Sequence, residues 1–307
     1  MTRHPSGLMR MTGEVERALI RSKPVVALES SVIAHGLPAD IGPDAAKEAQ
    51  QRVRDHGAVP ATVAVIGGAV RVGLDDEDID LLARESDVRK VGGRDLATCA
   101  VSGLTGGTTV AGTLAVCAMA GIHFMSTGGI GGVHRGWQGT LDMSADLTEA
   151  GRNEVCIVCS GIKSLLDIPA TLEMLETRGV PVIGYRTDTF PLFYVTDSVH
   201  PVADRADDAE TVAAVAAAHW GFARRTGILV VQPVAAEVAL AADETEALVE
   251  RALAEAGAAG VTGPAVTPWV LARLHEASNG RSLAANRRLL VDNAGLAAEI
   301  AAAYFAA

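Results

Sequence analysis

Short apolar runs that alternate with helix-like segments constrain the fold of this 307-residue chain more than any other feature. Seven such runs, bounded by glycine, proline or polar residues, have the length of buried strands: residues 24–29, 61–68, 69–73, 122–129, 154–161, 181–187 and 228–233. Between them lie segments with helical periodicity, at residues 43–55, 108–121, 168–178 and 208–226. Strands separated by helices predict a three-layer α/β/α fold around a largely parallel or mixed sheet.

The last third of the chain carries signals for further helix starts. Asp243 and Glu246 have the spacing of a capping box, and Thr267 followed by Pro268 predicts a helix cap with a first-turn proline. Ser282 is a candidate cap for the C-terminal helix. Because no Pro/Ser-rich linker or repeat interrupts the pattern, we expect a single domain.

Composition excludes several classes of protein. With 26 Lys and Arg against 37 Asp and Glu, the formal net charge of −11 disfavours a nucleic-acid polymer as partner. We expect no membrane-spanning helix, since no stretch of about 18 uncharged apolar residues occurs. The N-terminus lacks the apolar core of a signal peptide, and the 4 cysteines of this long chain suggest reduced thiols, so we expect a cytoplasmic protein.

Only 4 lysines occur, among 26 basic residues, and they are Lys23, Lys47, Lys90 and Lys163. An amine can lose its proton and attack a carbonyl, whereas a guanidinium stays protonated. Lys163 follows the apolar run VCIVCSG, where partial desolvation favours a nucleophile, although a lysine that extends its amine to solvent fits the same position. Lys90, beside Gly92 and Gly93, is either a phosphate ligand or a surface charge.

Three further features are candidate site elements. The segment STGGIGGVHRG (126–136) is either a simple turn or an anion-binding loop, in which His134 and Arg135 add charge. Asp142 and Asp146, four residues apart, suit a divalent cation or a helix cap with a solvated carboxylate. Glu29 at the end of the run PVVALE is either a half-buried general acid or a structural carboxylate.

The cysteines at 156 and 159 form a lone CxxC within an apolar run. Zinc would require a second ligand pair, and no pair with suitable spacing occurs in the sequence. We therefore interpret these two cysteines as part of a buried strand.

The motifs ESSVIAHGLP, PATVAVIGG, GGTTVAGT, TGGIGGVHRG, DMSADL, CSGIKSLLD, GVPVIGY, TPWVLARL and SLAANRRLLVDN follow one another in this order. They strongly resemble the pseudouridine-5′-phosphate glycosidase family, also called indigoidine synthase A-like, over roughly residues 14–305. The resemblance implies one α/β/α catalytic domain over residues 14–307, preceded by an N-terminal extension over residues 1–13. It also implies a divalent metal (typically Mn²⁺, or another such as Mg²⁺) and a homotrimer. This chain departs from the family pattern at Trp269 and at the Gly92–Gly93 pair, and neither departure removes a proposed catalytic group.

The resemblance also implies roles for individual residues. Glu29 matches the proton donor, Lys163 the nucleophile that forms a Schiff base with ribose C1, and Asp142 the metal ligand. The expected substrate-binding residues are Lys90, Val110, Ser144, Ala145, Asp146 and Asn286, together with His134 of the glycine-rich segment.

The function implied by the resemblance is reversible cleavage of the C1′–C5 bond of pseudouridine 5′-phosphate, giving uracil and ribose 5-phosphate. Two alternatives remain open on the sequence. One is another sugar-phosphate C–C lyase that uses the same lysine, and the other is a non-catalytic nucleotide-binding protein. The set of Glu29, Asp142 and Lys163 argues against the second, because binding alone needs no nucleophilic amine.

Overall fold

In the computed structural model, which describes residues 7–307, each of the seven predicted apolar runs contains a strand. The strands are β1 (Met9–Met11), β2 (Val25–Leu28), β3 (Val59–Ile66), β4 (Ala69–Val72), β5 (Arg89–Val91), β6 (Gly106–Thr108), β7 (Phe124–Ser126), β8 (Val133–His134), β9 (Cys156–Cys159), β10 (Leu166–Asp167), β11 (Val182–Tyr185), β12 (Asp204–Ala206) and β13 (Ile228–Val231). The short strands β1, β5, β6, β8, β10 and β12 were not predicted, since each has only two or three residues.

The main sheet has 11 strands in the order β1-β4-β3-β2-β7-β9-β13-β11-β12, with β6 paired to β3 and β5 to β6. All pairings are parallel except those of β3 with β4 and with β6, so the prediction of a largely parallel or mixed sheet is confirmed. The antiparallel pair β3–β4 follows from the predicted Gly67–Gly68 turn, where both glycines have positive φ (56° and 80°). A separate antiparallel pair joins β8 and β10.

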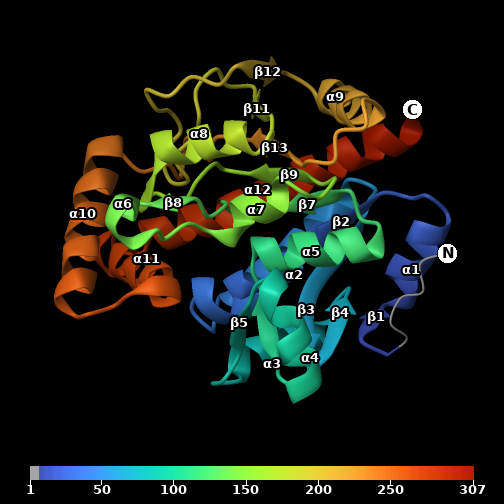
Figure 1. The fold of residues 1–307 in the computed structure, drawn as a ribbon, viewed down its shortest axis with the longest axis horizontal. Coiled ribbons are helices and arrows are strands. Elements are labelled where there is room, and N and C mark those ends of the chain that lie inside the picture. Colours follow the sequence, from blue (N-terminus) through green and yellow to red (C-terminus); the bar gives the residue numbers. More distant parts are fainter. Residues whose placement is uncertain (1–6) are drawn as a thin grey trace.

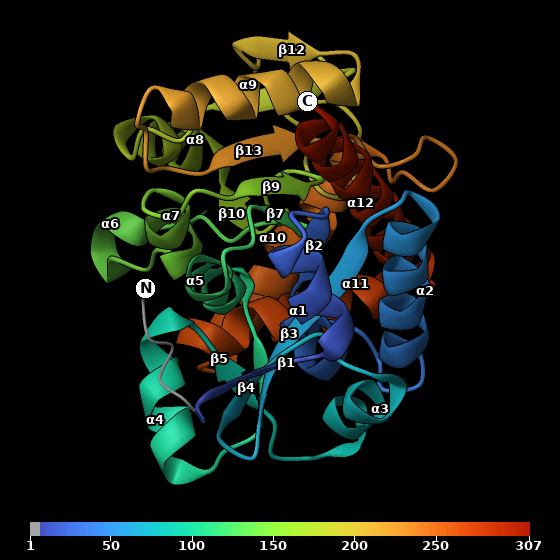
Figure 2. The same cartoon turned by 90° about the vertical axis from the view of Figure 1, so that its right-hand side faces the viewer.

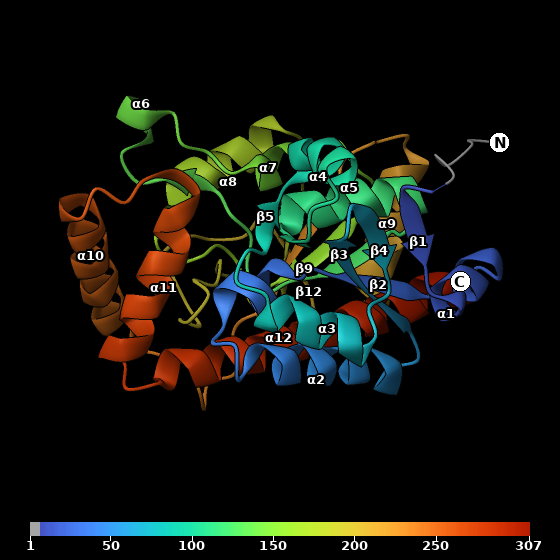
Figure 3. The same cartoon turned by 90° about the horizontal axis from the view of Figure 1, so that it is seen from below.

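Helices cover both faces of the sheet, as the alternating pattern predicts (Figures 1 and 2). They are α1 (Gly13–Ile20), α2 (Gly42–Asp55), α3 (Asp76–Arg84), α4 (Leu96–Ser102), α5 (Val110–Ala120), α6 (Trp137–Thr140), α7 (Ala145–Ala150), α8 (Ile168–Thr177), α9 (Ala209–Gly221), α10 (Ala242–Ala258), α11 (Val266–Ala277) and α12 (Arg281–Ala306), with a π-helical turn η1 (Val32–Gly36) and 3₁₀ turns η2 (Gly93–Asp95) and η3 (Gly263–Ala265). Figure 3 shows α2 and α12 on one side of the strands and α5, α7 and α8 on the other. Helices α10 and α11 form a hairpin at the left of the same view.

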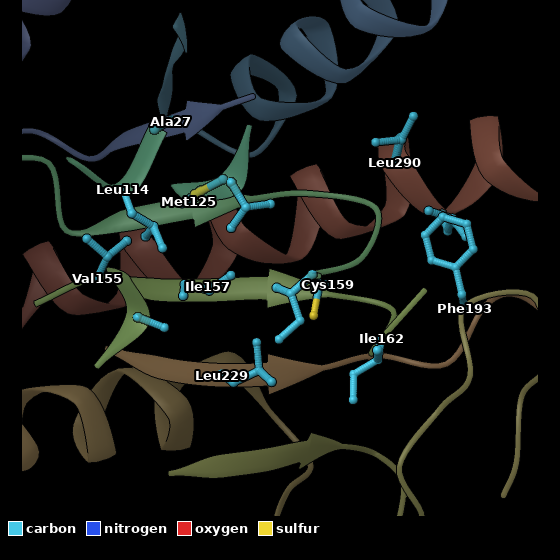
Figure 4. Packing of buried hydrophobic residues seen from close by; sticks show 14 of the residues in the cluster. Ala27, Leu114, Met125, Val155, Ile157, Cys159, Ile162, Phe193, Leu229 and Leu290 are labelled. Atoms are coloured by element: carbon cyan, nitrogen blue, oxygen red, sulfur yellow. The ribbon is translucent and has the colours of Figure 1, made fainter. Parts of the chain in front are cut away.

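The core is divided by the sheet into two layers. In β9 the side chains alternate, so that Ile157 and Cys159 pack with α5, α7 and α8, whereas Cys156 and Val158 pack with α9 and α12. Both cysteines are fully buried in the strand, which confirms their interpretation as core residues. Figure 4 shows the first layer, in which Met125, Ile157 and Leu229 lie along three parallel strands and Phe193 and Leu290 lie beyond the strand ends.

Three predictions of helix starts are wrong. Helix α10 begins after Ala241 with no side-chain cap, so Asp243 lies inside it, and Glu246 forms an ion pair with Arg135 instead of a capping box. Thr267 lies inside α11, which follows the 3₁₀ turn η3, and Ser282 lies inside α12 after Gly280. In each case the helix begins earlier than predicted, so the expected capping residue lies two positions after the observed N-cap residue.

Helix α9 is shorter than predicted. It ends at Gly221, and Ala223 adopts a left-handed φ of 59° that terminates the helical path before residue 226. The predicted helix was too long because the alanine-rich sequence favours a helix up to residue 226. The turn that ends the helix has no signal in the sequence.

Helix α12 is long and apolar enough to cross a membrane by length and composition alone. In the structure it packs against α2 and α9, and 61% of its most apolar window is buried inside the protein. The helix thus has the environment of a core helix. At the other end of the chain, β1 pairs with β4 in the main sheet, while the division of the chain at residue 13 stays a prediction.

Candidate functional site

A pocket lies at the carboxyl ends of the central parallel strands. Glu29 follows β2, Gly128 and Gly129 follow β7, and Lys163 follows β9. Ligands of open parallel sheets characteristically bind at this edge, where the strand ends release the chain into loops. The residues that line the cavity are Glu29, Ser31, Val32, His35, Gly36, Lys90, Gly128, Gly129, Lys163, Phe193, Thr267, Pro268, Leu271, Asn286 and Leu290.

Glu29 is buried, with 7% of its surface exposed, and both of its carboxylate oxygens are hydrogen-bonded. Ser31 Oγ donates to Oε2 at 2.8 Å, and Thr127 Oγ1 donates to Oε1. Two hydroxyl groups from different segments therefore fix the orientation of the carboxylate at the cavity wall. Glu29 therefore presents an oriented carboxyl group to the cavity, and its role as proton donor stays a prediction.

Lys163 and Lys90 line the cavity from two different elements. Lys163 is half-buried in the loop after β9, where its backbone N–H donates to Ile130 O at 3.3 Å. Lys90 is half-buried in β5. Burial lowers the pKa of Lys90, the charge of Lys163 lowers it further, and Asp146 and Glu29 oppose this effect. Two amines thus line one cavity, and the role of Lys163 as nucleophile stays a prediction.

His134 and Asp142 lie beside the cavity and are not among its lining residues. His134 Nδ1 is 3.8 Å from Asp142 Oδ2. Burial lowers the pKa of His134, Asp142 opposes this, and Lys90 and Lys163 add to it. The amines of Lys90 and Lys163 and the carboxylate of Asp142 therefore all lie close enough to affect the pKa of His134. Asp142 precedes α7 and does not share a helix face with Asp146.

The remaining predicted binding residues gather where α5 and α7 begin. Val110 is the first residue of α5, Ser144 caps α7, and Ala145 is the first residue of α7. The buried Asp146 accepts hydrogen bonds from the backbone N–H groups of Ala111 and Gly131, both at 2.8 Å. Asp146 thereby ties the glycine-rich segment to the start of α5, and direct contact of these four predicted residues with substrate stays a prediction.

Residues 14–303 match the family model described as indigoidine synthase A like protein. The chain belongs to the indigoidine synthase A-like family. It is 49% identical to the pseudouridine-5′-phosphate glycosidase of Symbiobacterium thermophilum, over 96% of this chain and 97% of the relative. The enzyme of that name from Escherichia coli strain K12 is 45% identical, over 97% and 96%.

Solved structures agree with this family assignment. The prealnumycin C-glycosynthase AlnA in complex with ribulose 5-phosphate has a TM-score of 0.90 and 40% identity, over 98% of both chains. An indigoidine synthase A-like protein from Thermotoga maritima has a TM-score of 0.89 and 35% identity, over 98% of both chains. The α/β/α fold predicted from the sequence is thus shared by these structures.

One expectation about the glycine-rich segment of this indigoidine synthase A-like protein is wrong. Arg135 does not line the cavity, because its guanidinium forms a bidentate pair with Glu246 and donates to Ser164 O at 3.2 Å. Hydrogen bonding to Glu246 raises the pKa of Arg135. The side chain therefore joins the α10–α11 hairpin to the loop that carries Lys163, and it has no free fork for a phosphate.

Several site residues of this family member were not identified from the sequence. Ser31 and His35 lie in the quoted block ESSVIAHGLP, and Thr127 lies in STGG, so the motif itself was the available signal. The His35 Nε2 atom is buried without a hydrogen-bond partner among residues 7–307, and burial lowers the pKa of this imidazole. Phe193 has a left-handed φ of 61°, and its ring lies against Gly129, where a Cβ would come within 2.6 Å of it. The sequence around Phe193 and Gly129 does not predict that these two residues are in contact.

Proposed function

We propose that this protein cleaves the C1′–C5 bond of pseudouridine 5′-phosphate reversibly, giving uracil and ribose 5-phosphate. The observation that carries the proposal is that Glu29, Lys90 and Lys163 line one cavity. Relatives 45–49% identical over nearly the whole chain bear the name of this enzyme, and the similar C-glycosynthase holds a five-carbon sugar phosphate. A carboxyl group and an amine in one pocket supply the proton donor and the nucleophile that this reaction requires.

The chemistry differs from ordinary glycoside hydrolysis because the leaving atom is carbon. The amine of Lys163, in its neutral form, attacks C1′ while Glu29 gives its proton to the ring oxygen, and the ribose opens. The nitrogen now bonded to C1′ gives up a proton, and its lone pair forms the C1′=N iminium as the C1′–C5 bond breaks. The electrons of that bond go to C5 of uracil, which takes up a proton. Water then hydrolyses the imine, which releases ribose 5-phosphate and restores the amine of Lys163.

The phosphate group requires local donors, since a chain of formal charge −11 repels a dianion at long range. Lys90 and the backbone N–H groups of the glycine-rich segment are the proposed donors, with His134 assisting at the edge of the site. Substrate selection is proposed to rest on this anion site, so the nucleoside without phosphate should react with a kcat/KM lower by about 100-fold or more, as expected when a charged hydrogen-bonding site is left empty. Equal kcat/KM values for nucleoside and nucleotide would contradict it.

A divalent cation, Mn²⁺ or Mg²⁺, is proposed to bind through Asp142. Within residues 7–307 no group of three or more His, Cys, Asp or Glu side chains is arranged to hold a metal. A single carboxylate fits a hard cation that keeps most of its waters, and when bound it would stabilise negative charge on the ligand. We expect a chelator to abolish turnover, Mn²⁺ to restore it, and Asp142→Ala to behave like the chelated enzyme. Full activity of metal-free protein would contradict this part of the proposal.

The assembly, which the family resemblance implies, and the location belong to the same proposal. We propose a homotrimer in the cytoplasm, with no membrane and no nucleic-acid polymer as partner. Light scattering coupled to size exclusion measures the mass of the assembly, and a monomeric mass at micromolar concentration would contradict the trimer. Cell fractionation with an antibody against the protein tests the location.

The decisive experiment is incubation of the purified protein with pseudouridine 5′-phosphate and divalent metal, with chromatographic detection of uracil and ribose 5-phosphate. Stoichiometric release of both products is expected. Binding without turnover would favour a non-catalytic nucleotide-binding protein. Imine formation with a sugar phosphate but no uracil release would favour another C–C lyase that uses the same lysine.

A further inference from the structure

Asn293 is a fully buried residue of α12 whose side chain reaches three neighbouring strands. Its Nδ2 donates to Thr127 O at 3.0 Å and to Ser160 Oγ at 3.1 Å, and its Oδ1 accepts from Gln232 Nε2 at 3.3 Å. Both amide hydrogens and the carbonyl oxygen are thus occupied. A buried amide with a complete set of partners holds those partners in one arrangement.

The three partners occupy equivalent places in the sheet. Thr127 is the first residue after β7, Ser160 the first after β9, and Gln232 the first after β13. These strands are adjacent and parallel, so their ladder hydrogen bonds end at the same edge. Beyond that edge the backbone groups need other hydrogen-bond partners. Asn293 lies next to the first residues of the loops that follow these strands.

One partner leads to the acid of the site. The hydroxyl of Thr127 donates to Glu29, while the carbonyl of the same residue accepts from Asn293. The next two residues, Gly128 and Gly129, line the cavity. A shift of the Thr127 backbone therefore moves the carboxylate of Glu29 and the floor of the cavity together.

The second partner leads to the nucleophile. Ser160 lies three residues before Lys163, its N–H donates to Gly128 O at 2.9 Å, and its carbonyl accepts from Phe193 N at 2.9 Å. Ser160 therefore connects the start of the lysine loop to two segments of the cavity wall. Asn286 and Leu290, on the same helix as Asn293, line the cavity directly.

Resting on the proposed function, we infer that Asn293 is a positioning residue that holds Glu29 and Lys163 in register with each other, through Thr127 on one side and Ser160 on the other. It does not touch the cavity and so acts only through these neighbours. Misplacement of reacting groups by about 1 Å costs on the order of 100-fold in rate, which sets the size of the expected effect.

The test compares Asn293→Asp with Gln50→Glu. Gln50 is a matched control because it is also a buried helical amide, whose Nε2 donates to Thr62 Oγ1 at 3.0 Å and to Leu74 O at 3.3 Å, and it does not line the cavity. Each substitution replaces a buried donor by an acceptor, so both should lower the melting temperature. We expect Asn293→Asp to lower kcat by about 100-fold with KM changed by less than about threefold, whereas Gln50→Glu keeps kcat within about twofold.

A second readout does not depend on turnover. Competitive acetylation with acetic anhydride, followed by peptide mass spectrometry, measures the reactivity of Lys163 relative to the exposed Lys23 in the same molecule. We expect the Lys163/Lys23 ratio to change at least threefold in Asn293→Asp and to stay constant in Gln50→Glu. If the wild-type protein does not cleave pseudouridine 5′-phosphate, the proposed function fails, and this ratio alone decides the inference.

The inference is overturned if Asn293→Asp has wild-type kcat and labelling, or if both variants lose activity in parallel with their stability. Should Asn293→Asp not fold, Ser160→Ala removes one of the two donor contacts and is measured in the same way. We expect it to lower kcat about tenfold and to change the Lys163/Lys23 ratio in the same direction. Wild-type values of both quantities in Ser160→Ala would then overturn the inference.

Discussion

The interiors of β7, β9 and β13 and the residues that directly follow them present opposite chemistry a few ångströms apart. Inside, the side chains are apolar and fully covered, and burial raises the pKa of both Cys156 and Cys159 to about 12, so these thiols stay protonated and unreactive. Immediately after the strands, the backbone carbonyl of Thr127 and the polar side chains of Ser160 and Gln232 converge on Asn293.

This difference follows from where the backbone hydrogen bonds go. Within the sheet each strand satisfies its neighbours, and a side chain has only to fill space. After the last hydrogen bond between neighbouring strands, polar side chains must supply the hydrogen-bond partners that a neighbouring strand no longer provides. The same side chains can then orient Glu29 and Lys163 toward a ligand. Chemistry is therefore concentrated at one edge of a sheet whose interior is inert. The following predictions test this contrast.

Replacement of Lys163 by Arg should have the largest effect. It keeps the positive charge but removes the amine that can lose a proton, so turnover should fall by roughly 10⁴-fold or more. Borohydride added with ribose 5-phosphate should leave a stable adduct on Lys163 of the wild-type protein, located by mass spectrometry. Lys23→Arg is the control and should keep full activity, since Lys23 is exposed outside the cavity. An active Lys163→Arg enzyme, or a specific adduct on Lys90, would assign the nucleophile elsewhere.

Replacement of Glu29 by Gln should have the next largest effect on rate. The amide nearly preserves shape but cannot supply the proton for ring opening, so kcat should fall by about 100- to 1,000-fold. The borohydride adduct on Lys163 should still accumulate slowly, because open-chain ribose 5-phosphate needs no ring opening. Steady-state kinetics and adduct mass spectrometry together check this. Loss of the adduct as well as turnover would mean that Glu29 also controls the amine.

Replacement of Cys156 by Ser should affect the interior alone. Cys156 is fully buried in the layer formed with α9 and α12, and a hydroxyl placed there without a partner costs about 1–3 kcal/mol in the free energy of unfolding. Urea denaturation measures this loss. At temperatures below unfolding, kcat should remain within about twofold of wild type. A much larger decrease of kcat in a folded Cys156→Ser variant would show that the interior and the edge are not separable.

Replacement of Lys90 by Met should have the smallest effect on stability, and in the opposite direction. The pKa of Lys90 is lowered mainly by burial, so the folded state disfavours its charged form. Removing this charge should raise the melting temperature at pH 7 by about 2 °C while raising KM for the phosphorylated substrate.

The pH dependence fixes the sign of this last effect. As pH rises through the lowered pKa toward 10.5, the folded protein loses the Lys90 proton before the unfolded chain does. The free energy of unfolding of the wild type therefore rises relative to that of the variant. The difference in melting temperature between Lys90→Met and wild type should therefore be largest near neutral pH and shrink in alkali. A difference that grows with pH would contradict the assigned cause.

Much of the site could be predicted because its residues stand in local motifs. Glu29, Lys90, Lys163 and Asn286 all line the cavity, and each was singled out from the sequence. Arg135 was predicted wrongly, since its partner Glu246 is 111 residues away and was itself expected to cap a helix. The capping box at 243–246 is absent because α10 begins before Asp243.

The sequence by itself determined the alternation of strands and helices, the burial of the CxxC strand and the family, because periodicity and motif order are local properties of the chain. Only the tertiary structure decided which polar groups meet. Asn293 is 166 residues from Thr127 and 133 from Ser160, and Thr127 is 98 residues from Glu29. Contacts over such distances depend on how strands are ordered in the sheet and which helix packs beneath them, and the residues concerned carry no mark of this in their neighbours along the chain.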